Sequence, residues 1–161
     1  MGELFNFTKI GYTTGNSFAL AYASIPPNAG PASHIHHWTD EWLYFPEGGL
    51  VFFSSYQQYP DPKQIPNGCQ LPKTDMHRYY TKPGDLIYGS RFYVHGYRNE
   101  DNVSHPVITV WTPDIISQFF LQAGQIVTDF SKLPNVSQVN MELFVTLAPF
   151  YGMNISSYWD E

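Results

Sequence analysis

Cysteine is almost absent from this chain of 161 residues, which contains only Cys69. A single thiol cannot form an internal disulfide, so the fold must be stabilised by its core alone. A chain of this length can bury such a core as one domain, residues 1–161. Cys69 lies in a loop where only His77 is near enough in sequence to activate it, and we expect an inert thiol.

Positive charge is also scarce. The chain has 8 Lys and Arg residues against 14 Asp and Glu, which gives a formal net charge of −6. Nucleic acids and anionic membrane surfaces bind basic patches, so we expect neither as a partner. No apolar stretch approaches the ~20 residues of a membrane-spanning helix. Residues 1–20 also lack the basic start and continuous apolar segment of a signal peptide.

Four sequons for N-glycosylation leave two localisations open. They predict a secreted glycoprotein whose signal peptide is not part of these 161 residues. Coincidental matches in a β protein rich in Ser and Thr would give the same pattern in a cytoplasmic protein. The sequons begin at Asn6, Asn102, Asn135 and Asn154.

Turn-forming residues divide the chain between residues 4 and 112 into short segments. Glycine, proline and asparagine separate stretches with the apolar and aromatic composition of strands. Regular short strands of this kind are typical of an all-β sandwich or barrel. We expect a barrel over about residues 4–112, with strands at 4–12, 17–24, 32–37, 41–45, 49–56, 77–81, 85–89, 92–97 and 106–111.

After residue 112 the apolar pattern changes to helical spacing. A first helix is predicted from Asp114 to Gly124 and a second at 139–147. We expect this C-terminal segment, residues 113–161, to pack on the barrel. A Phe-rich helix could alternatively bury the seam of a homodimer.

Three histidines and one glutamate have the spacing of a metal site. On an extended strand His34 and His36 project to one face, about 7 Å apart, while His37 points to the other face. A turn can bring the carboxylate of Glu41 to the same point, and His95 follows a later turn and strand. Such a site suits one divalent transition metal, which could be Fe, Cu, Mn, Ni, Co or Zn.

The same residues match the first of two motifs that define the cupin superfamily. That motif is H-x-H, four residues, E, six residues and G, and His34, His36, Glu41 and Gly48 meet it without a gap. The chain therefore resembles a single cupin domain. The resemblance covers about residues 15–112 and implies an all-β, two-sheet jelly-roll barrel, here with C-terminal helices packed on it.

The second cupin motif is matched less completely. Gly84, His95 and Asn99 occupy their places in G, five residues, P-x-G-x-x-H-x-x-x-N, but Ser90 replaces the proline and Phe92 replaces the second glycine. The ligand assignment is unaffected. The turn before His95 becomes bulkier, so the family's pocket shape cannot be transferred to this region.

Within the superfamily, the order of features resembles the quercetinase-type dioxygenases. The ligand motif, a loop, Pro83-Gly84-Asp85, the ligand histidine and a segment that passes into helix follow one another in that order. The resemblance implies metal binding by His34, His36, Glu41 and His95. It also implies proton transfer from a flavonol-like enolic hydroxyl to Glu41 and ring opening by dioxygen.

Two other classes of function stay open at this stage. The same Glu41 could serve a non-redox isomerase, cyclase or lyase of a polyketide-like molecule. A non-catalytic binding or storage protein would have to keep the ligand set without a reaction. The fold alone cannot decide, because one scaffold of this kind hosts many reactions.

Aromatic residues make up 17% of the chain and crowd around the ligand segments. Most of them should fill the barrel. Those that line an open metal cavity would favour a flat apolar or aromatic substrate, and our candidates are Phe45, Tyr93 and Tyr97. The proline-rich segment 57–75 is predicted to be a long loop, which is either a surface insertion or a border of the cavity mouth.

Overall fold

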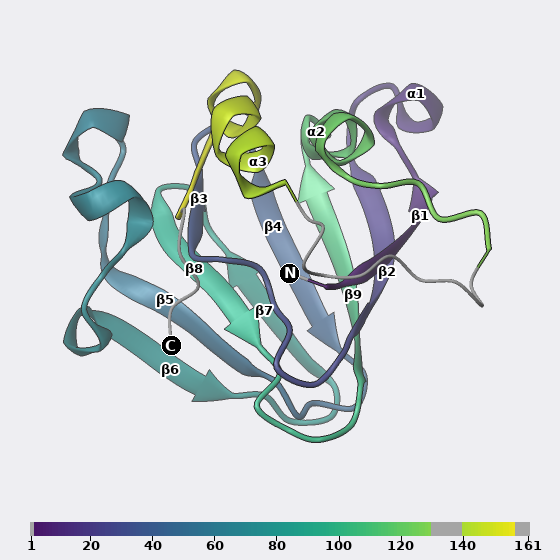
Figure 1. The fold of residues 1–161 in the computed structure, drawn as a ribbon, viewed down its shortest axis with the longest axis horizontal. Helices are drawn as coiled ribbons and strands as arrows, with labels where there is room; N and C mark the ends of the chain where they lie inside the picture. The colour runs from purple at the N-terminus through teal and green to yellow at the C-terminus, as the bar shows by residue number, and fades with distance from the viewer. Residues whose placement is uncertain (1, 130–139, 157–161) are drawn as a thin grey trace.

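The computed structural model describes residues 2–129 and 140–156, which form two five-stranded antiparallel sheets (Figure 1). The first sheet has the order β1-β2-β9-β4-β7 and the second the order β10-β3-β8-β5-β6. From β2 to β5, successive strands alternate between the two sheets, as in a jelly roll, which confirms the all-β barrel. The strands are β1 Leu4–Lys9, β2 Ala19–Ile25, β3 His34–His36, β4 Asp40–Phe45, β5 Val51–Gln58, β6 Met76–Tyr80, β7 Asp85–Gly89, β8 Tyr93–Arg98, β9 His105–Thr112 and β10 Met153–Ile155.

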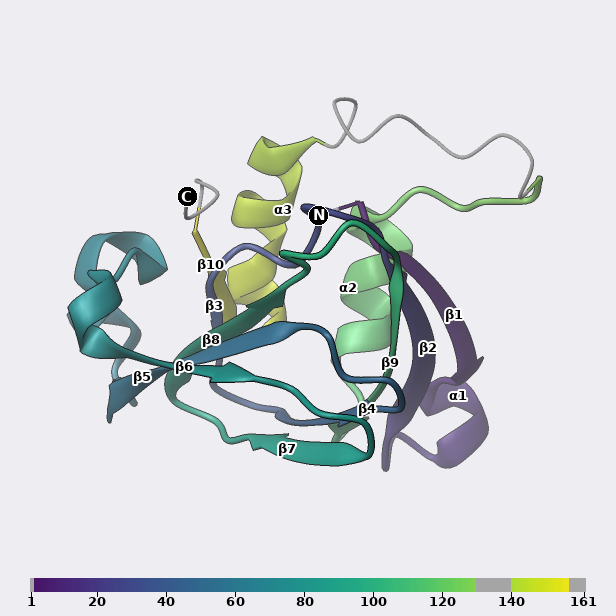
Figure 2. The ribbon, with the colours of Figure 1, turned by 90° about the horizontal axis from the view of Figure 1, so that it is seen from below.

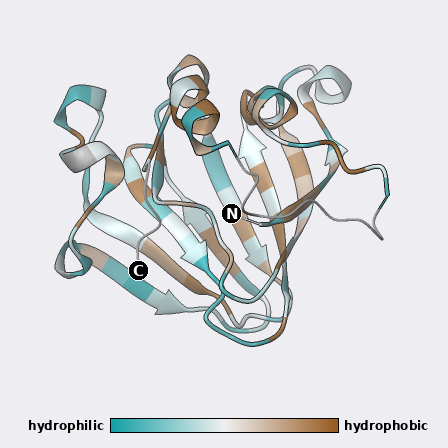
Figure 3. Ribbon diagram, viewed as in Figure 1, coloured by the Kyte–Doolittle hydropathy of each residue, from teal (hydrophilic) through white to brown (hydrophobic). Residues whose placement is uncertain are grey.

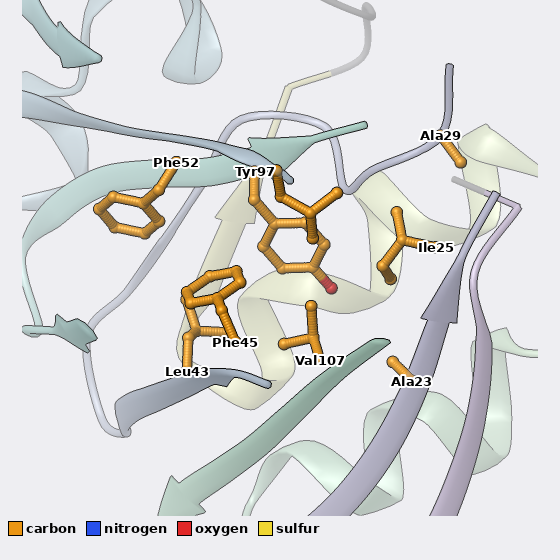
Figure 4. Packing of buried hydrophobic residues seen from close by; sticks show 9 residues of the cluster. Ala23, Ile25, Ala29, Leu43, Phe45, Phe52, Tyr97 and Val107 are labelled. Carbon is orange, nitrogen blue, oxygen red and sulfur yellow. The ribbon is translucent and has the colours of Figure 1, made fainter. Parts of the chain in front are cut away.

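Alternation along β4 separates the barrel interior from its outer face, as the sequence predicts. Glu41, Leu43 and Phe45 are buried, whereas Trp42 and Tyr44 are each 39% exposed. The buried residues of β4 meet those of β2, β8 and β9 in a core between the sheets (Figure 4). In that core the ring of Phe45 packs edge-on to the ring of Tyr97, with centroids 6.5 Å apart.

Two helices close one end of the barrel (Figures 1 and 2). They are α2, Ile116–Ala123, and α3, Met141–Leu147, and their apolar side chains pack against Trp111 and the strands beside it. Brown, apolar segments mark both helices in Figure 3. The predicted helices are confirmed, although Val139 lies outside the described residues. No helix within the described ranges is long and apolar enough to cross a membrane.

Three parts of the fold differ from the sequence prediction. The first strand ends at Lys9, and residues Gly11–Thr14 form the short helix α1. The last strand, β10, was not predicted and adds to the second sheet beside β3. Segment 57–75 begins as the end of β5 and continues through three short 3-10 turns, at Pro62–Gln64, Pro66–Cys69 and Lys73–Asp75.

Candidate metal centre

Three strands from both sheets bring the four predicted ligands together. His34 and His36 lie on β3, and β3 pairs with β8 so that His34 is opposite His95. Glu41 faces them from β4 of the other sheet. One donor atom from each residue lies within 4.8 Å of every other, so the convergence expected from the sequence is present.

One carboxylate oxygen of Glu41 is the centre of this cluster. Its Oε2 lies 3.0 Å from Nε2 of His95, 3.5 Å from Nε2 of His36 and 3.7 Å from Nε2 of His34. Glu41, His36 and His95 are each at most 4% exposed. Because water hardly reaches the cluster, its polar atoms depend on one another or on a bound ion.

In His34 and His95, the hydrogen bond made by Nδ1 leaves Nε2 free to bind a metal. Nδ1 of His34 lies 3.0 Å from the carbonyl of Ala32, and Nδ1 of His95 lies 2.9 Å from the carbonyl of Tyr93. A carbonyl only accepts, so each Nδ1–H is the donor, and in a neutral ring Nε2 then carries a lone pair. Such second partners orient a metal-ligating histidine in this way.

Protonation alone cannot satisfy this cluster. Burial lowers the pKa of His36 from 6.5 to about 4, so this ring is neutral at pH 7. Burial raises the pKa of Glu41, but the three imidazoles outweigh that effect and hold it well below its usual range. Neither nitrogen of His36 makes a hydrogen bond of good geometry to any described residue.

A cation resolves these contacts. The ionised carboxylate of Glu41 facing a lone pair of the neutral His36 ring is repulsive, and a proton on another ring would not relieve that contact. A divalent metal would accept a lone pair from each of the four residues, and three nitrogen donors with one oxygen donor suit a transition metal. The residues present therefore fit one metal ion.

A cavity of about 500 Å³ opens from the cluster toward the helices. His34, His36 and Glu41 line its inner end, and the rest of its wall comes mainly from β1, α2 and the segment 124–127 that follows α2. Of the three aromatic residues proposed to bind substrate, Tyr97 lines this cavity. Phe45 is fully buried in the core, and Tyr93 is not among the lining residues.

Sequence reasoning missed the main aromatic wall of the cavity. Phe5, Phe7, Trp111 and Phe120 line it, although they lie outside both motifs. The signal was present in the apolar faces of the first strand and the first C-terminal helix, but those faces look like ordinary packing surfaces. No residue of segment 57–75 lines the cavity. The side chains of Cys69 and other residues in this segment pack against the second sheet instead.

Other residues with polar or reactive side chains lie away from the four ligands. His37, His77 and His105 lie outside the cluster. The side chain of Asn99 accepts a hydrogen bond from the backbone N–H of Asp101, 2.9 Å away, as turn-forming asparagines do. Cys69 is buried, and its Sγ donates a hydrogen bond to the carbonyl of Asn154, 3.4 Å away.

Two motif positions, Gly48 and Phe92, have a left-handed backbone. Gly48 has φ +67°, and a Cβ atom there would lie 2.6 Å from the carbonyl oxygen of Thr81. Phe92, which stands where the second motif has glycine, also has a positive φ of 73°. This position therefore has a left-handed backbone without the residue that adopts it most easily.

Searches against protein-family models and curated proteins found no match for this chain. Solved structures do resemble it. An oxalate oxidase in complex with glycolate is 12% identical over 70% of this chain and 51% of its own, with a TM-score of 0.52. KdgF from Halomonas sp. is 14% identical over 73% of this chain and 85% of its own, with a TM-score of 0.51.

A predicted oxalate decarboxylase from Thermotoga maritima is 16% identical over 69% of this chain and 80% of its own, with a TM-score of 0.50. The chain thus spans about half the length of the oxalate oxidase. At these identities the likeness concerns the fold. Together with the two antiparallel sheets, it shows that this chain has the cupin jelly-roll fold.

Proposed function

We propose that the protein is a metal-dependent enzyme that cleaves a flavonol-like or other enolic aromatic or polyketide-like substrate with dioxygen. The observation that carries the proposal is the buried convergence of His34, His36, Glu41 and His95 at the closed end of a cavity large enough for such a molecule. The structural neighbours that are named as enzymes share the fold only, and a fold does not fix chemistry.

The chain's own residues divide the work in this proposal. The three imidazoles and Glu41 would hold one divalent transition metal, which supplies Lewis-acid or redox chemistry when bound. Glu41 is ionised at neutral pH and lines the cavity, so its carboxylate can accept the proton of a substrate hydroxyl. The apolar wall excludes water from the reacting atoms.

Oxygen uptake by the metal-loaded protein tests this function. We expect about one metal ion per chain by elemental analysis, and dioxygen consumption with 3-hydroxyflavone or a hydroxylated polyketide. His95→Ala should lose the metal, whereas Glu41→Gln should keep part of it and lose activity ~10²-fold or more. His77→Ala is the matched control, because His77 is exposed and outside the cluster.

The outcome also separates the other two classes of function. Turnover at the same rate without dioxygen would replace the dioxygenase by a non-redox isomerase, cyclase or lyase that uses the same proton transfer. Full metal occupancy without turnover of any enolic substrate would favour a binding protein. Full activity in Glu41→Gln would remove the acid–base role of that residue.

We also propose a homodimer, but through a different surface from the helices. The apolar faces of α2 and α3 pack on the barrel end and line the cavity. The outer face of the first sheet instead leaves five large side chains 39–61% exposed, namely Tyr22, Trp42, Tyr44, Leu86 and Tyr88.

Secretion and glycosylation remain predictions, and the sequons differ in access. Asn102 lies in an exposed turn, and Asn6 is exposed on β1. The sequon at Asn154 lies on β10, and its Ser156 is fully buried. Asn135 is outside the described residues. If the chain enters the secretory pathway, we propose glycans at Asn102 and Asn6 but not at Asn154.

A further inference from the structure

The cavity above the metal cluster has two chemically different ends. At its inner end are the polar donors of His34, His36 and Glu41. Toward the outside, β1 and α2 supply almost entirely apolar side chains. Neither of these two elements belongs to the ligand motifs, so the outer half of the cavity is a feature of this chain and not of the metal site.

Four aromatic rings form a continuous wall in this outer half. Phe5, Phe7, Trp111 and Phe120 all line the cavity. All six centroid distances among these rings lie between 4.8 and 6.2 Å, so each ring contacts the other three. Rings that support one another in this way form a wall before any ligand arrives, which lowers the entropy cost of binding.

The charges around the cavity disfavour polyanions. No Lys or Arg occurs among the described residues that line it, whereas Glu3 and Glu41 both do. With no cation among these lining residues, the local field beside the carboxylates is negative. A bound divalent metal would offset this field at the inner end only.

Size leads to the same conclusion. A volume of about 500 Å³ suits a ligand of several rings or a long chain. A small dianion such as oxalate would fill only a minor part of it and would leave the aromatic wall exposed to water. A phosphorylated sugar would place its phosphate beside carboxylates and apolar rings without a cationic partner.

We propose that β1 and α2 form a distal subsite, which holds the uncharged apolar body of a substrate whose single oxygen-bearing head lies at the metal cluster. This inference rests on the proposed function for the placement of the head. The distal subsite itself requires neither metal nor turnover, and this makes it separately testable.

Binding of flavone to the metal-free protein, followed by calorimetry, tests the subsite. Flavone lacks the hydroxyl that would react, so binding reports the apolar contacts alone. We expect flavone to bind, and 3-hydroxyflavone to gain affinity only after metal is added. Oxalate and glucose 6-phosphate should not displace flavone at a hundredfold excess.

A matched pair of variants on α2 locates the contact. Ala123 lines the cavity, whereas its neighbour Gln122 is exposed and does not. Ala123→Phe fills the distal subsite and should weaken flavone binding at least tenfold, while Gln122→Phe should leave it unchanged. Phe120→Ala removes part of the ring wall and should also weaken binding, and far-UV circular dichroism checks that each variant is folded.

The results separate the subsite from the reaction. Flavone binding that is lost in Ala123→Phe, without turnover of 3-hydroxyflavone, supports the subsite and contradicts the dioxygenase. Turnover of 3-hydroxyflavone with an unchanged KM in Ala123→Phe overturns the subsite and leaves the reaction standing. Displacement of flavone by oxalate or glucose 6-phosphate would also overturn the proposed selectivity.

Discussion

Phe92 places a large side chain at a backbone position suited to glycine. Its φ of 73° is left-handed, yet its N–H donates to the carbonyl of His36 and its own carbonyl accepts from Tyr59. These two hydrogen bonds hold the strained residue between the end of β3 and Tyr59, which follows β5. A left-handed conformation costs a residue with a Cβ atom roughly 1–2 kcal/mol.

Because of this strain, we expect the glycine variant at position 92 to be more stable than the alanine variant, the reverse of the usual order. Phe92→Gly and Phe92→Ala both lose the ring, but only glycine also loses the strain, so Phe92→Gly should be about 1 kcal/mol more stable than Phe92→Ala in urea unfolding. At Tyr80, an exposed strand residue whose φ is not positive, alanine should instead exceed glycine. The same order at both positions would show that Phe92 is not strained.

At the residue scale, alternation on strands predicted most of the candidate site. It placed His34 and His36 on one face and His37 on the other, and it placed Glu41 inside the barrel. Alternation could not say how deep along the barrel an inward residue lies. Phe45 shares a face with Glu41 but lies four residues further along, and the structure places it in the core instead of the cavity wall.

At the scale of elements, Asp114 fixes the start of α2. Its carboxylate accepts hydrogen bonds from the backbone N–H of Ser117, 2.9 Å away, from the Ser117 hydroxyl and from the backbone of Gly11. Asp114 is only 7% exposed. One buried side chain therefore caps the first turn of α2 and ties it to Gly11, at the start of α1 just after β1, so the two elements of the distal subsite are held together.

Removing this carboxylate should be costly. We expect Asp114→Ala to lower the free energy of unfolding by about 3 kcal/mol, because it uncaps the helix and leaves buried donors without a partner. Asp114→Asn, which keeps one acceptor oxygen, should lose less. Asp61 caps a 3-10 turn through Lys63 at an exposed site, so Asp61→Ala should cost under ~1 kcal/mol. Equal losses at Asp114 and Asp61 in urea unfolding would contradict this role.

Elements with a clear period were predictable, and short or irregular ones were not. The strands carrying the ligands and the helix ending at Gly124 follow from apolar spacing and turn residues. The strand β10 has three residues, too few for alternation to be recognised, and it forms only because β3 offers a free edge. The cavity depends on how α2 meets β1 across more than 100 residues, and no local pattern encodes that contact.

At the scale of the whole molecule, the outer face of the first sheet has the character of an interface. Pairing places Tyr88, Trp42, Val110 and Leu20 in one row across the sheet, and Leu86, Tyr44, Ile108 and Tyr22 in the next. These eight residues include no charged side chain, although Lys9 on β1 extends the first row beside Leu20 and Asn6 extends the second beside Tyr22. The rings of Trp42 and Tyr88 also contact each other, with centroids 4.5 Å apart.

The area of this face fits a second copy of the chain. Its five large exposed side chains present roughly 500 Å² in total, and the intermediate residues between them add to it. A standard interface buries ~800 Å² per partner, while monomers rarely expose an apolar patch beyond a few hundred Å². The uncharged rows also keep the net charge of −6 on each copy away from the seam.

Light scattering coupled to size-exclusion chromatography should therefore give twice the chain mass of 18.5 kDa. Tyr88→Glu places a charge within the seam, where it would lose water on association, and should give a monomer with unchanged secondary structure. Tyr80→Glu, on β6 of the other sheet and also exposed, should remain dimeric. A wild-type chain that stays monomeric up to about 100 µM, well above the Kd of a standard interface, would contradict the proposed homodimer.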